Sequence, residues 1–166
     1  MLNRWADGSA AMDEETLRVF SMKLAGLFGV KPDEVAVLRL EKKRKHLRFI
    51  LPVQLHEVGT IPLSSSSALA ARTARERRPE VMNAFAGARH ASVFEGVPMG
   101  RRADEAIQKI MSAPVLSGSE VIGVVQISRK GRSQMEAGPD FGSTNLKTLS
   151  ELMPTIVRFL QLSPKS

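Results

Sequence analysis

Apolar residues recur along the chain with helical spacing in some segments and with strand spacing in others. The first segment carries apolar residues at intervals of three and four positions, at Leu17, Phe20, Leu24 and Leu27. This spacing predicts one apolar face of a helix, with Asp13 as its N-cap and Gly29 as its end. Two alternating runs follow, at 35–40 and 47–53, on either side of the charged run Lys42–Lys45. They predict a hairpin whose charged tip is exposed, and Pro52 suggests an edge position or a bulge.

The middle of the chain predicts a second helix and a short strand. Four serines, Ser64 to Ser67, precede an alanine-rich segment, and a serine hydroxyl accepts a hydrogen bond from an unpaired N–H at a helix start. We expect this helix to end before Pro79. The alternation of Val81, Asn83 and Phe85 then predicts a short strand.

The last third begins with a long loop, 86–102, of the kind that often binds or covers a ligand. Apolar runs at 110–116 and 121–127 flank a turn and predict an antiparallel hairpin, with the second strand central in the sheet. Gly123 within that strand predicts a bulge or a close backbone approach.

A final helix is predicted by apolar residues with heptad spacing at Leu146, Leu149, Met153, Ile156 and Leu160. Pro154 lies within this run and should kink the helix or split it in two. No internal repeat or linker interrupts the pattern, so residues 1–166 are expected to form a single domain with its core at about 17–160.

Composition excludes several classes of function. The 166 residues are 43% apolar and 25% charged, as in a globular protein, and include no cysteine. A disulfide framework, a thiolate metal site, a cysteine nucleophile and a thioether-linked chromophore are therefore excluded. No apolar stretch approaches the roughly 20 residues of a membrane span, and the N-terminal residues 1–8 lack the apolar core of a secretory signal. We expect a cytoplasmic protein without membrane contact.

The net charge of +7 and the pI of about 10.2 raise the question of an acidic partner. The main basic clusters are Lys42–Lys45 and Arg72–Arg78. Aromatic residues make up only 5%, and Trp5, the single tryptophan, is distant in sequence from both clusters, which argues against nucleic acid. We interpret the clusters as a solvated hairpin tip and helix face. The alternative is a ligand-free interaction protein that binds an acidic partner or nucleic acid through these patches.

Three segments resemble parts of GAF domains. Gly59–Asn83 is similar to that family's loop, helix and third strand, Ile107–Lys130 to its central hairpin, and Phe141–Leu149 to the opening of its last helix. The resemblance implies an α+β fold with a six-stranded antiparallel sheet. The N- and C-terminal helices would pack on one face of that sheet, and a ligand-pocket loop region would lie on the other.

The resemblance implies a small-molecule-sensing or protein-interaction module in bacterial-type signal transduction, and not an enzyme. Its partners would be a second copy, through the terminal helices, and an unknown signalling protein. No cofactor is assigned, and the small molecule is unknown. Without cysteine, bilin attachment and methionine sulfoxide reduction in the manner of family members are excluded. Asn83 lacks the following lysine of cyclic-nucleotide binders, and His90 is the one candidate haem ligand.

The candidate ligand-binding residues flank the long loop and the strands that it covers: Asn83, Phe85, Phe94, Ile107, Gln108 and Met111. Asn83 and Gln108 would be the polar anchors. Ordinary core packing is the alternative for Phe85, Ile107 and Met111. No catalytic residue and no metal ligand is assigned, because the serines lack a positioned histidine and no two histidines share a helical face.

Overall fold

The structure is a computed structural model, and it describes residues 13–55, 59–85 and 106–162. These residues contain a six-stranded antiparallel sheet in the order β3-β2-β1-β6-β5-β4. The strands are β1 (Val35–Glu41), β2 (His46–Leu51), β3 (Thr60–Pro62), β4 (Glu80–Met82), β5 (Ile107–Ser117) and β6 (Glu120–Lys130). The α+β fold predicted from the sequence is confirmed.

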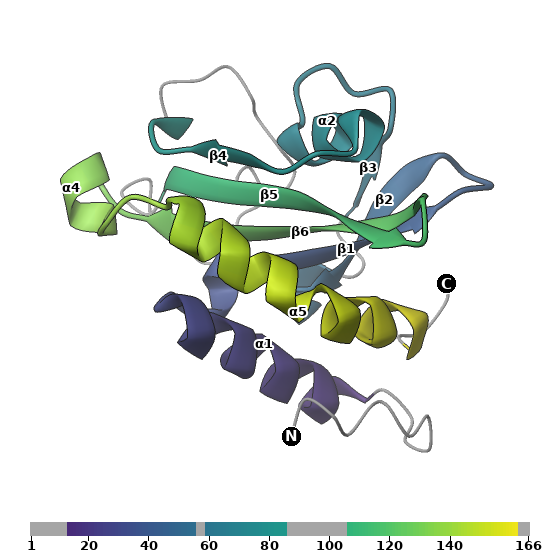
Figure 1. The fold of residues 1–166 in the computed structure, drawn as a ribbon, viewed down its shortest axis with the longest axis horizontal. Coiled ribbons are helices and arrows are strands. Elements are labelled where there is room, and N and C mark those ends of the chain that lie inside the picture. The colour runs from purple at the N-terminus through teal and green to yellow at the C-terminus, as the bar shows by residue number, and fades with distance from the viewer. Residues whose placement is uncertain (1–12, 56–58, 86–105, 163–166) are drawn as a thin grey trace.

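Helices cover both faces of this sheet (Figure 1). The α-helices are α1 (Glu14–Phe28), α2 (Leu69–Glu76), α4 (Gln134–Ala137) and α5 (Ser143–Leu162), and the short 3-10 helices are η2 (Pro32–Glu34) and η3 (Val53–Leu55). The terminal helices α1 and α5 pack on one face, and α2 lies over the other (Figure 1). The predicted placement of the terminal helices is therefore confirmed.

The predicted bounds of α1 are confirmed by its caps. A carboxylate oxygen of Asp13 accepts a hydrogen bond from the Thr16 N–H at 2.8 Å, and Gly29 closes the helix in the left-handed region at a φ of 65°. One apolar position differs from the prediction, because Leu27 is 52% exposed and Phe28 is buried in its place. The helix therefore turns part of its apolar surface away from the sheet.

The sheet separates two apolar clusters. On the side of α1 and α5, the rings of Phe20 and Phe159 stack with centroids 3.9 Å apart and join the terminal helices to each other. On the other side, α2 meets the sheet through small side chains, at Ala68, Ala70, Ala71 and Ala74. Because these residues carry only a methyl group, the helix backbone can lie close to the strands.

Gly123 marks the close approach that the sequence predicted. A Cβ atom at this position would lie 2.3 Å from the backbone oxygen of Leu38 on β1 and 2.6 Å from Cδ1 of Leu160 on α5. The β5–β6 pairing is also irregular here, between Val115 and Leu116. The absence of a side chain at this position lets β6 and α5 pack at their observed separation.

Pro154 does not split the last helix, in contrast to one of the two outcomes predicted for it. Residues Ser143–Leu162 form one helix with Pro154 inside it and exposed. The carbonyl that proline leaves without a partner belongs to Ser150, which is itself exposed, so water can reach that group. Leu149 and Ile156 on either side are buried against the sheet and hold both halves in one line.

The remaining local differences concern the middle of the chain. The fourth strand ends at Met82, so Asn83 lies in a turn and the predicted strand over 81–85 is too long. Helix α2 begins at Leu69, and Ser65 Oγ accepts from the Ala68 N–H at 3.1 Å, which places the serine one turn ahead of the helix. None of the helices in the described segments is long and apolar enough to cross a bilayer.

Candidate functional site

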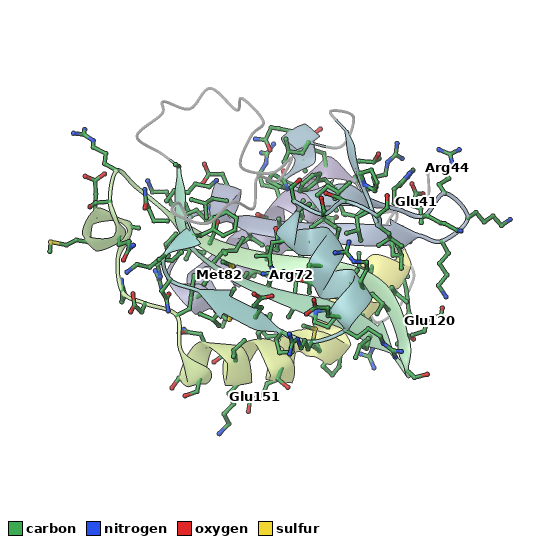
Figure 2. The ribbon with its side chains drawn as sticks, turned by 90° about the horizontal axis from the view of Figure 1, so that it is seen from above. Glu41, Arg44, Arg72, Met82, Glu120 and Glu151 are labelled. Atoms are coloured by element: carbon green, nitrogen blue, oxygen red, sulfur yellow. The ribbon has the colours of Figure 1, made fainter. Side chains whose placement is uncertain are left out.

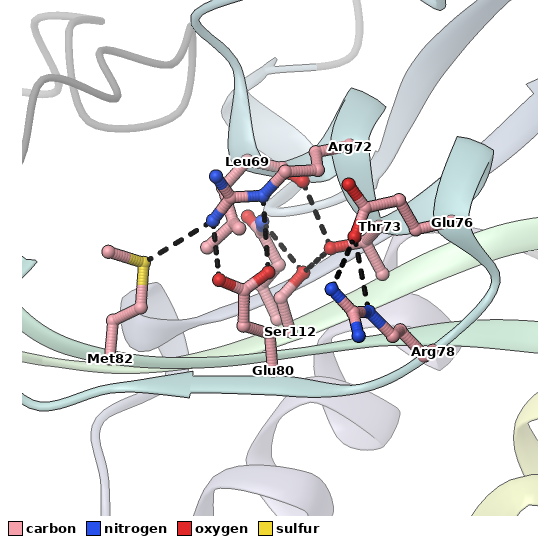
Figure 3. A network of polar contacts seen from close by, with 9 residues as sticks. Leu69, Arg72, Thr73, Glu76, Arg78, Glu80, Met82 and Ser112 are labelled. Carbon is pink, nitrogen blue, oxygen red and sulfur yellow. Dashed lines mark hydrogen bonds and ion pairs between the residues drawn. The ribbon is translucent and has the colours of Figure 1, made fainter.

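A buried polar cluster lies between α2 and the centre of the sheet (Figure 3). Thr73 of α2 and Ser112 of β5 have their hydroxyl oxygens 2.7 Å apart, and Nε2 of Gln126 on β6 lies 3.2 Å from Ser112 Oγ. None of the three residues exposes more than 1% of its surface. The apolar side chains of the α2-side cluster surround them, so these polar groups can interact only with one another and with the adjacent backbone.

The hydrogen bonds of this cluster run in one direction. Thr73 donates its hydroxyl hydrogen to the carbonyl oxygen of Leu69, at 2.9 Å. A hydroxyl has one hydrogen, so the bond between Thr73 and Ser112 is donated by Ser112. Ser112 in turn accepts from Gln126. We call Gln126, Ser112 and Thr73 the polar relay. Its members come from three elements, so a displacement of α2 would break the relay.

An ion pair closes the outer side of the polar relay. The guanidinium of Arg72 on α2 binds both carboxylate oxygens of Glu80 on β4, with Nε at 3.2 Å and Nη2 at 2.5 Å (Figure 3). The same Nη2 lies 3.8 Å from the sulfur of Met82. The two charges compensate each other, so this rim is neutral. A charged ligand on this side would find no free counter-charge at Arg72 or Glu80.

Two of the predicted ligand-binding residues lie on the same side of the sheet as the polar relay. Phe85, just after β4, is 2% exposed, and Ile107, at the start of β5, is 1% exposed. Both belong to the apolar cluster beneath α2. Their roles as ligand contacts stay predictions, since the residues also complete the core.

Three other candidates are placed elsewhere. Met111 is buried on the opposite side of the sheet, among residues of α1 and α5. The amide of Asn83 binds the backbone of Phe141, and Nε2 of Gln108 donates to the Gly131 carbonyl at 2.8 Å. The five candidates in the described part of the chain therefore do not converge on one cavity. Phe94, the whole of the loop 86–102 and the haem candidate His90 lie outside the described residues.

The separation of Ile107 from Met111 has a structural cause. Positions four apart on a regular strand point to the same face. The pairing of β5 with β6 shifts register between Ile107 and Lys109, so this alternation is interrupted. Ile107 and Ile110 consequently share the α2 side, while Met111 points to the helices α1 and α5.

The sequence does not predict the polar relay, because its three members lie in different local sequence contexts. Ser112 and Gln126 each interrupt an apolar strand, which is a recognisable signal for a buried polar site. Thr73 lies in a helix whose outward residues are charged, and nothing local separates it from them. Thr73 and Ser112 are 39 positions apart, so only the folded chain brings them together.

The described surface also carries open grooves away from the polar relay. The larger one, of about 600 Å³, lies between α1, η2 and the end of β2, and Arg18, Lys31, Asp33 and Gln54 are among its lining residues. A smaller one, of about 190 Å³, lies between α5 and β5, with Leu146, Met153 and Pro114 among its lining residues. Neither contains a residue predicted from the sequence to bind ligand.

The polar relay has no group suited to acid–base chemistry among its three members. His46, the one histidine in the described part of the chain, pairs with Glu41 on the β1–β2 hairpin, Nε2 to Oε1 at 2.9 Å. Within that part, no three histidine, aspartate or glutamate side chains come together in a way that could hold a metal ion. The relay offers hydroxyl and amide groups for hydrogen bonding, and it carries no charged group.

Comparison with known proteins supports the fold. No protein-family model matches the sequence, and no curated protein sequence does. Among solved structures, the GAF domain of an Acinetobacter phosphoenolpyruvate-protein phosphotransferase matches with a TM-score of 0.66 at 12% identity, over 96% of this chain and 90% of that one. The GAF domain of a Bacillus halodurans two-component sensor histidine kinase matches with a TM-score of 0.59 at 18% identity, over 90% of this chain and 97% of that one.

An enzyme shares the same fold. The free methionine-R-sulfoxide reductase of Neisseria meningitidis, solved with its substrate, matches with a TM-score of 0.62 at 15% identity, over 96% of this chain and 84% of that one. These identities are low, so the matches describe the shape of the chain alone. The resemblance to GAF domains noted in the sequence is thereby confirmed at the level of the fold.

Proposed function

Because the protein has the GAF fold, we propose that it is a sensor module of signal transduction that binds a small molecule between α2 and the sheet. The polar relay is the observation that carries this proposal. It places two hydroxyls and an amide inside an apolar cluster, at the junction of a short helix with strands β5 and β6. A ligand that exchanges hydrogen bonds with these groups would change the position of α2.

The ligand would be small, largely apolar and uncharged. The side chains around the polar relay are aliphatic or aromatic, such as Phe85 and Ile110, and the Arg72–Glu80 rim is neutral as a pair. Burial of an uncompensated charge costs several kcal/mol, on the order of the whole affinity of a modest ligand. A neutral molecule with one donor and one acceptor would satisfy Ser112 and Gln126 in place of their mutual bond.

The same proposal holds that the module does not catalyse a reaction and that it acts in the cytoplasm. The chain has no cysteine, so it lacks a thiol for reductase chemistry. The hydroxyl of Ser112 is hydrogen-bonded to Thr73 and to Gln126, and neither of these residues is a base that activates a nucleophile. The output would therefore pass to a signalling partner, and a second copy of the chain would pair through α1 and α5.

Native mass spectrometry of the freshly purified protein tests ligand binding first. We expect excess mass of a small molecule that disappears on denaturation, and the released compound then supplies the probe for titration. Ser112→Ala removes the centre of the polar relay, and Ser128→Ala is its matched control. Ser128 is also fully buried on the sheet, but its hydroxyl donates to the Glu34 carbonyl and takes no part in the relay.

The expected result is a loss of affinity of about tenfold or more in Ser112→Ala and little change in Ser128→Ala. Both variants lose one buried hydroxyl, so both should be destabilised to a similar degree. Equal affinity for the ligand in the two variants would show that the polar relay is not part of the ligand-binding site. A protein that carries no ligand, and whose melting temperature no small metabolite raises, would contradict the sensor function itself.

A further inference from the structure

Two basic clusters that are distant in sequence meet at one end of the sheet. The tip of the β1–β2 hairpin, Lys42–Lys45, lies beside the β5–β6 turn, because the ammonium of Lys42 pairs with the carboxylate of Glu120, the first residue of β6. The tip also contacts the loop before α2, where the Leu63 N–H donates to the Lys45 carbonyl at 3.0 Å. The hairpin tip, the β5–β6 turn and this loop occupy the same end of the molecule (Figure 1).

The end of α2 brings the second cluster to the same place. Nη1 of Arg75 donates to the carbonyls of Leu63, at 2.5 Å, and Ser65, at 2.8 Å. Nη2 of Arg77 donates to the Ser119 carbonyl on the β5–β6 turn. Arg75 and Arg77 are thus held against the two segments that the hairpin tip also contacts. Arg72, in contrast, turns away to its ion pair with Glu80.

We call the exposed cations of this surface the basic end: Lys42, Lys43, Arg44, Lys45, Arg75, Arg77 and Arg78. Three carboxylates are interspersed with them, and each has a partner: Glu41 pairs with His46, Glu76 with Arg78 and Glu120 with Lys42. Lys43, Arg44, Lys45, Arg75 and Arg77 have no carboxylate partner in the described part of the chain.

We propose that the basic end is the docking surface for an acidic segment of a partner protein. Like charges gathered on one surface repel each other, and a partner of opposite charge relieves that repulsion and accelerates encounter. The arginines are preorganised, because carbonyl bonds hold Arg75 and Arg77 while leaving other N–H groups of each guanidinium for a carboxylate. Arg44 projects from the hairpin tip, away from the body of the molecule (Figure 2).

A polypeptide fits this surface better than a nucleic acid. Among the described residues of the basic end, no phenylalanine, tyrosine or tryptophan is present on which a base could stack. Its three carboxylates would face a continuous phosphate backbone, which carries a charge about every 1.7 Å along a duplex. A polypeptide can instead place an uncharged or basic residue opposite Glu41, Glu76 or Glu120. The eight-residue α2 also runs against the sheet rather than projecting as a recognition helix.

The proposal rests on the signalling role of the module, because it names the chemistry of the partner that receives the signal. It does not rest on ligand binding. The basic end contains no member of the polar relay, so Ser112→Ala should bind the acidic partner as the wild type does. If the protein carried no ligand but still bound an acidic segment, the ligand proposal would fail and this proposal would hold.

The test uses a fluorescein-labelled peptide of alternating glutamate and glycine as the probe, with the full chain at about 50 mM salt. A DNA duplex and a single-stranded RNA of equal total charge serve as competitors. The Lys43→Glu/Arg44→Glu variant reverses two charges of the basic end whose side chains make no described ion pair or hydrogen bond. The Lys31→Glu/Arg132→Glu variant reverses two exposed charges, one just before η2 and one just before α4, outside the basic end and outside α1 and α5, and is the control.

We expect the peptide to bind the wild type, and its affinity to fall by about tenfold in the hairpin variant and by less than about twofold in the control. Circular dichroism and light scattering should show that both variants keep the fold and oligomeric state of the wild type. No binding of the peptide, or an equal loss in both variants, would overturn the proposal. Tighter binding of the duplex or the RNA, lost in the hairpin variant, would also overturn it and assign the surface to nucleic acid.

Discussion

Asn83 and Phe141, 58 positions apart, exchange two hydrogen bonds. Nδ2 of Asn83 donates to the Phe141 carbonyl at 3.0 Å, and the Phe141 N–H donates to Asn83 Oδ1 at 2.9 Å. The amide thereby pairs with the backbone as a neighbouring strand would. Phe141 in turn lies under the guanidinium of Arg129, 4.7 Å from the ring centroid. The turn after β4 and the segment before α5 are therefore joined at one point.

Loss of this amide should destabilise the protein. Asn83→Ala removes both bonds and leaves the Phe141 N–H and carbonyl partly buried, so we expect a loss of about 2 kcal/mol in the free energy of unfolding by denaturant. Asn145→Ala is the control, since its Oδ1 accepts a single exposed bond from Gly142. A loss of at most about 1 kcal/mol is expected there. Similar losses in the two variants would contradict a structural role particular to Asn83.

A methyl group at Gly123 should be tolerated poorly. Its Cβ would lie 2.3 Å from the Leu38 backbone oxygen, and that oxygen belongs to the neighbouring strand, so it cannot move without the sheet. We expect Gly123→Ala to cost on the order of 2–4 kcal/mol by thermal or chemical unfolding. Leu160→Ala, which removes the second close atom, should not restore stability, because the clash with Leu38 remains.

Gly26 supplies the opposite case for comparison. It lies within α1, and a Cβ there would meet no atom within 4 Å. Gly26→Ala should therefore raise the free energy of unfolding by about 0.5–1 kcal/mol, because alanine restricts the unfolded chain and favours the helix. If the two alanine variants changed stability in the same direction, the packing explanation for Gly123 would be wrong.

Arg39 and Arg48 face each other across β1 and β2 as a pair of like charges. The Nε atoms of both are buried without a hydrogen-bond partner. Burial lowers the pKa of Arg39, and Glu41 opposes that shift in part. The Arg39 cation is thus less stable here than in water, and a second cation opposite adds to the cost.

Arg48→Met should for this reason stabilise the protein by about 1 kcal/mol, which corresponds to a rise of roughly 2–4 °C in the melting temperature. The side chain keeps its length and apolar contacts while the charge and the unpaired Nε are removed. Arg44→Met, on the exposed tip of the same hairpin, should leave the melting temperature unchanged. A lower melting temperature in Arg48→Met would mean that Arg48 makes a net favourable interaction.

The proposed pairing of two copies through the terminal helices can be tested on α1. Met22 and Leu27 expose 57% and 52% of their surface on this helix. Met22→Glu/Leu27→Glu would put two carboxylates into such an interface, and light scattering should then report a monomer in place of a dimer. Met135→Glu on α4, where the methionine is 92% exposed, should leave the dimer intact. A wild-type monomer would contradict the pairing.

Local signals in the sequence were enough to predict the helices and strands whose limits depend on neighbouring residues. Asp13 and Gly29 set the ends of α1 because capping acts within one turn of a helix. The apolar runs around Ser117–Glu120 predicted the long β5–β6 hairpin, since alternation and a turn are features of adjacent residues. Gly123, a glycine inside an apolar strand, predicted a bulge or a close backbone approach, and the structure shows the close approach.

The residues that make up the candidate ligand site were harder to predict from the sequence. Phe85 and Ile107 do reach the side of the sheet beneath α2, as apolar residues beside the long loop were expected to. Met111 was predicted to lie with them because it flanks the same long loop, and on a regular strand it would point to the same face as Ile107. The register shift between Ile107 and Lys109 reverses that orientation, and such an irregularity depends on the pairing with β6.

The order, type and approximate limits of most helices and strands could be predicted from the sequence, because hydrophobic periodicity and capping are short-range effects. Which polar residues contact one another is visible only in the folded chain. Thr73 and Ser112 form their bond across 39 positions, Asn83 pairs with Phe141 across 58, and Lys42–Lys45 joins Arg75 and Arg77 at one end of the sheet. These contacts depend on how strands and helices pack against one another, and spacing along the chain does not encode that packing.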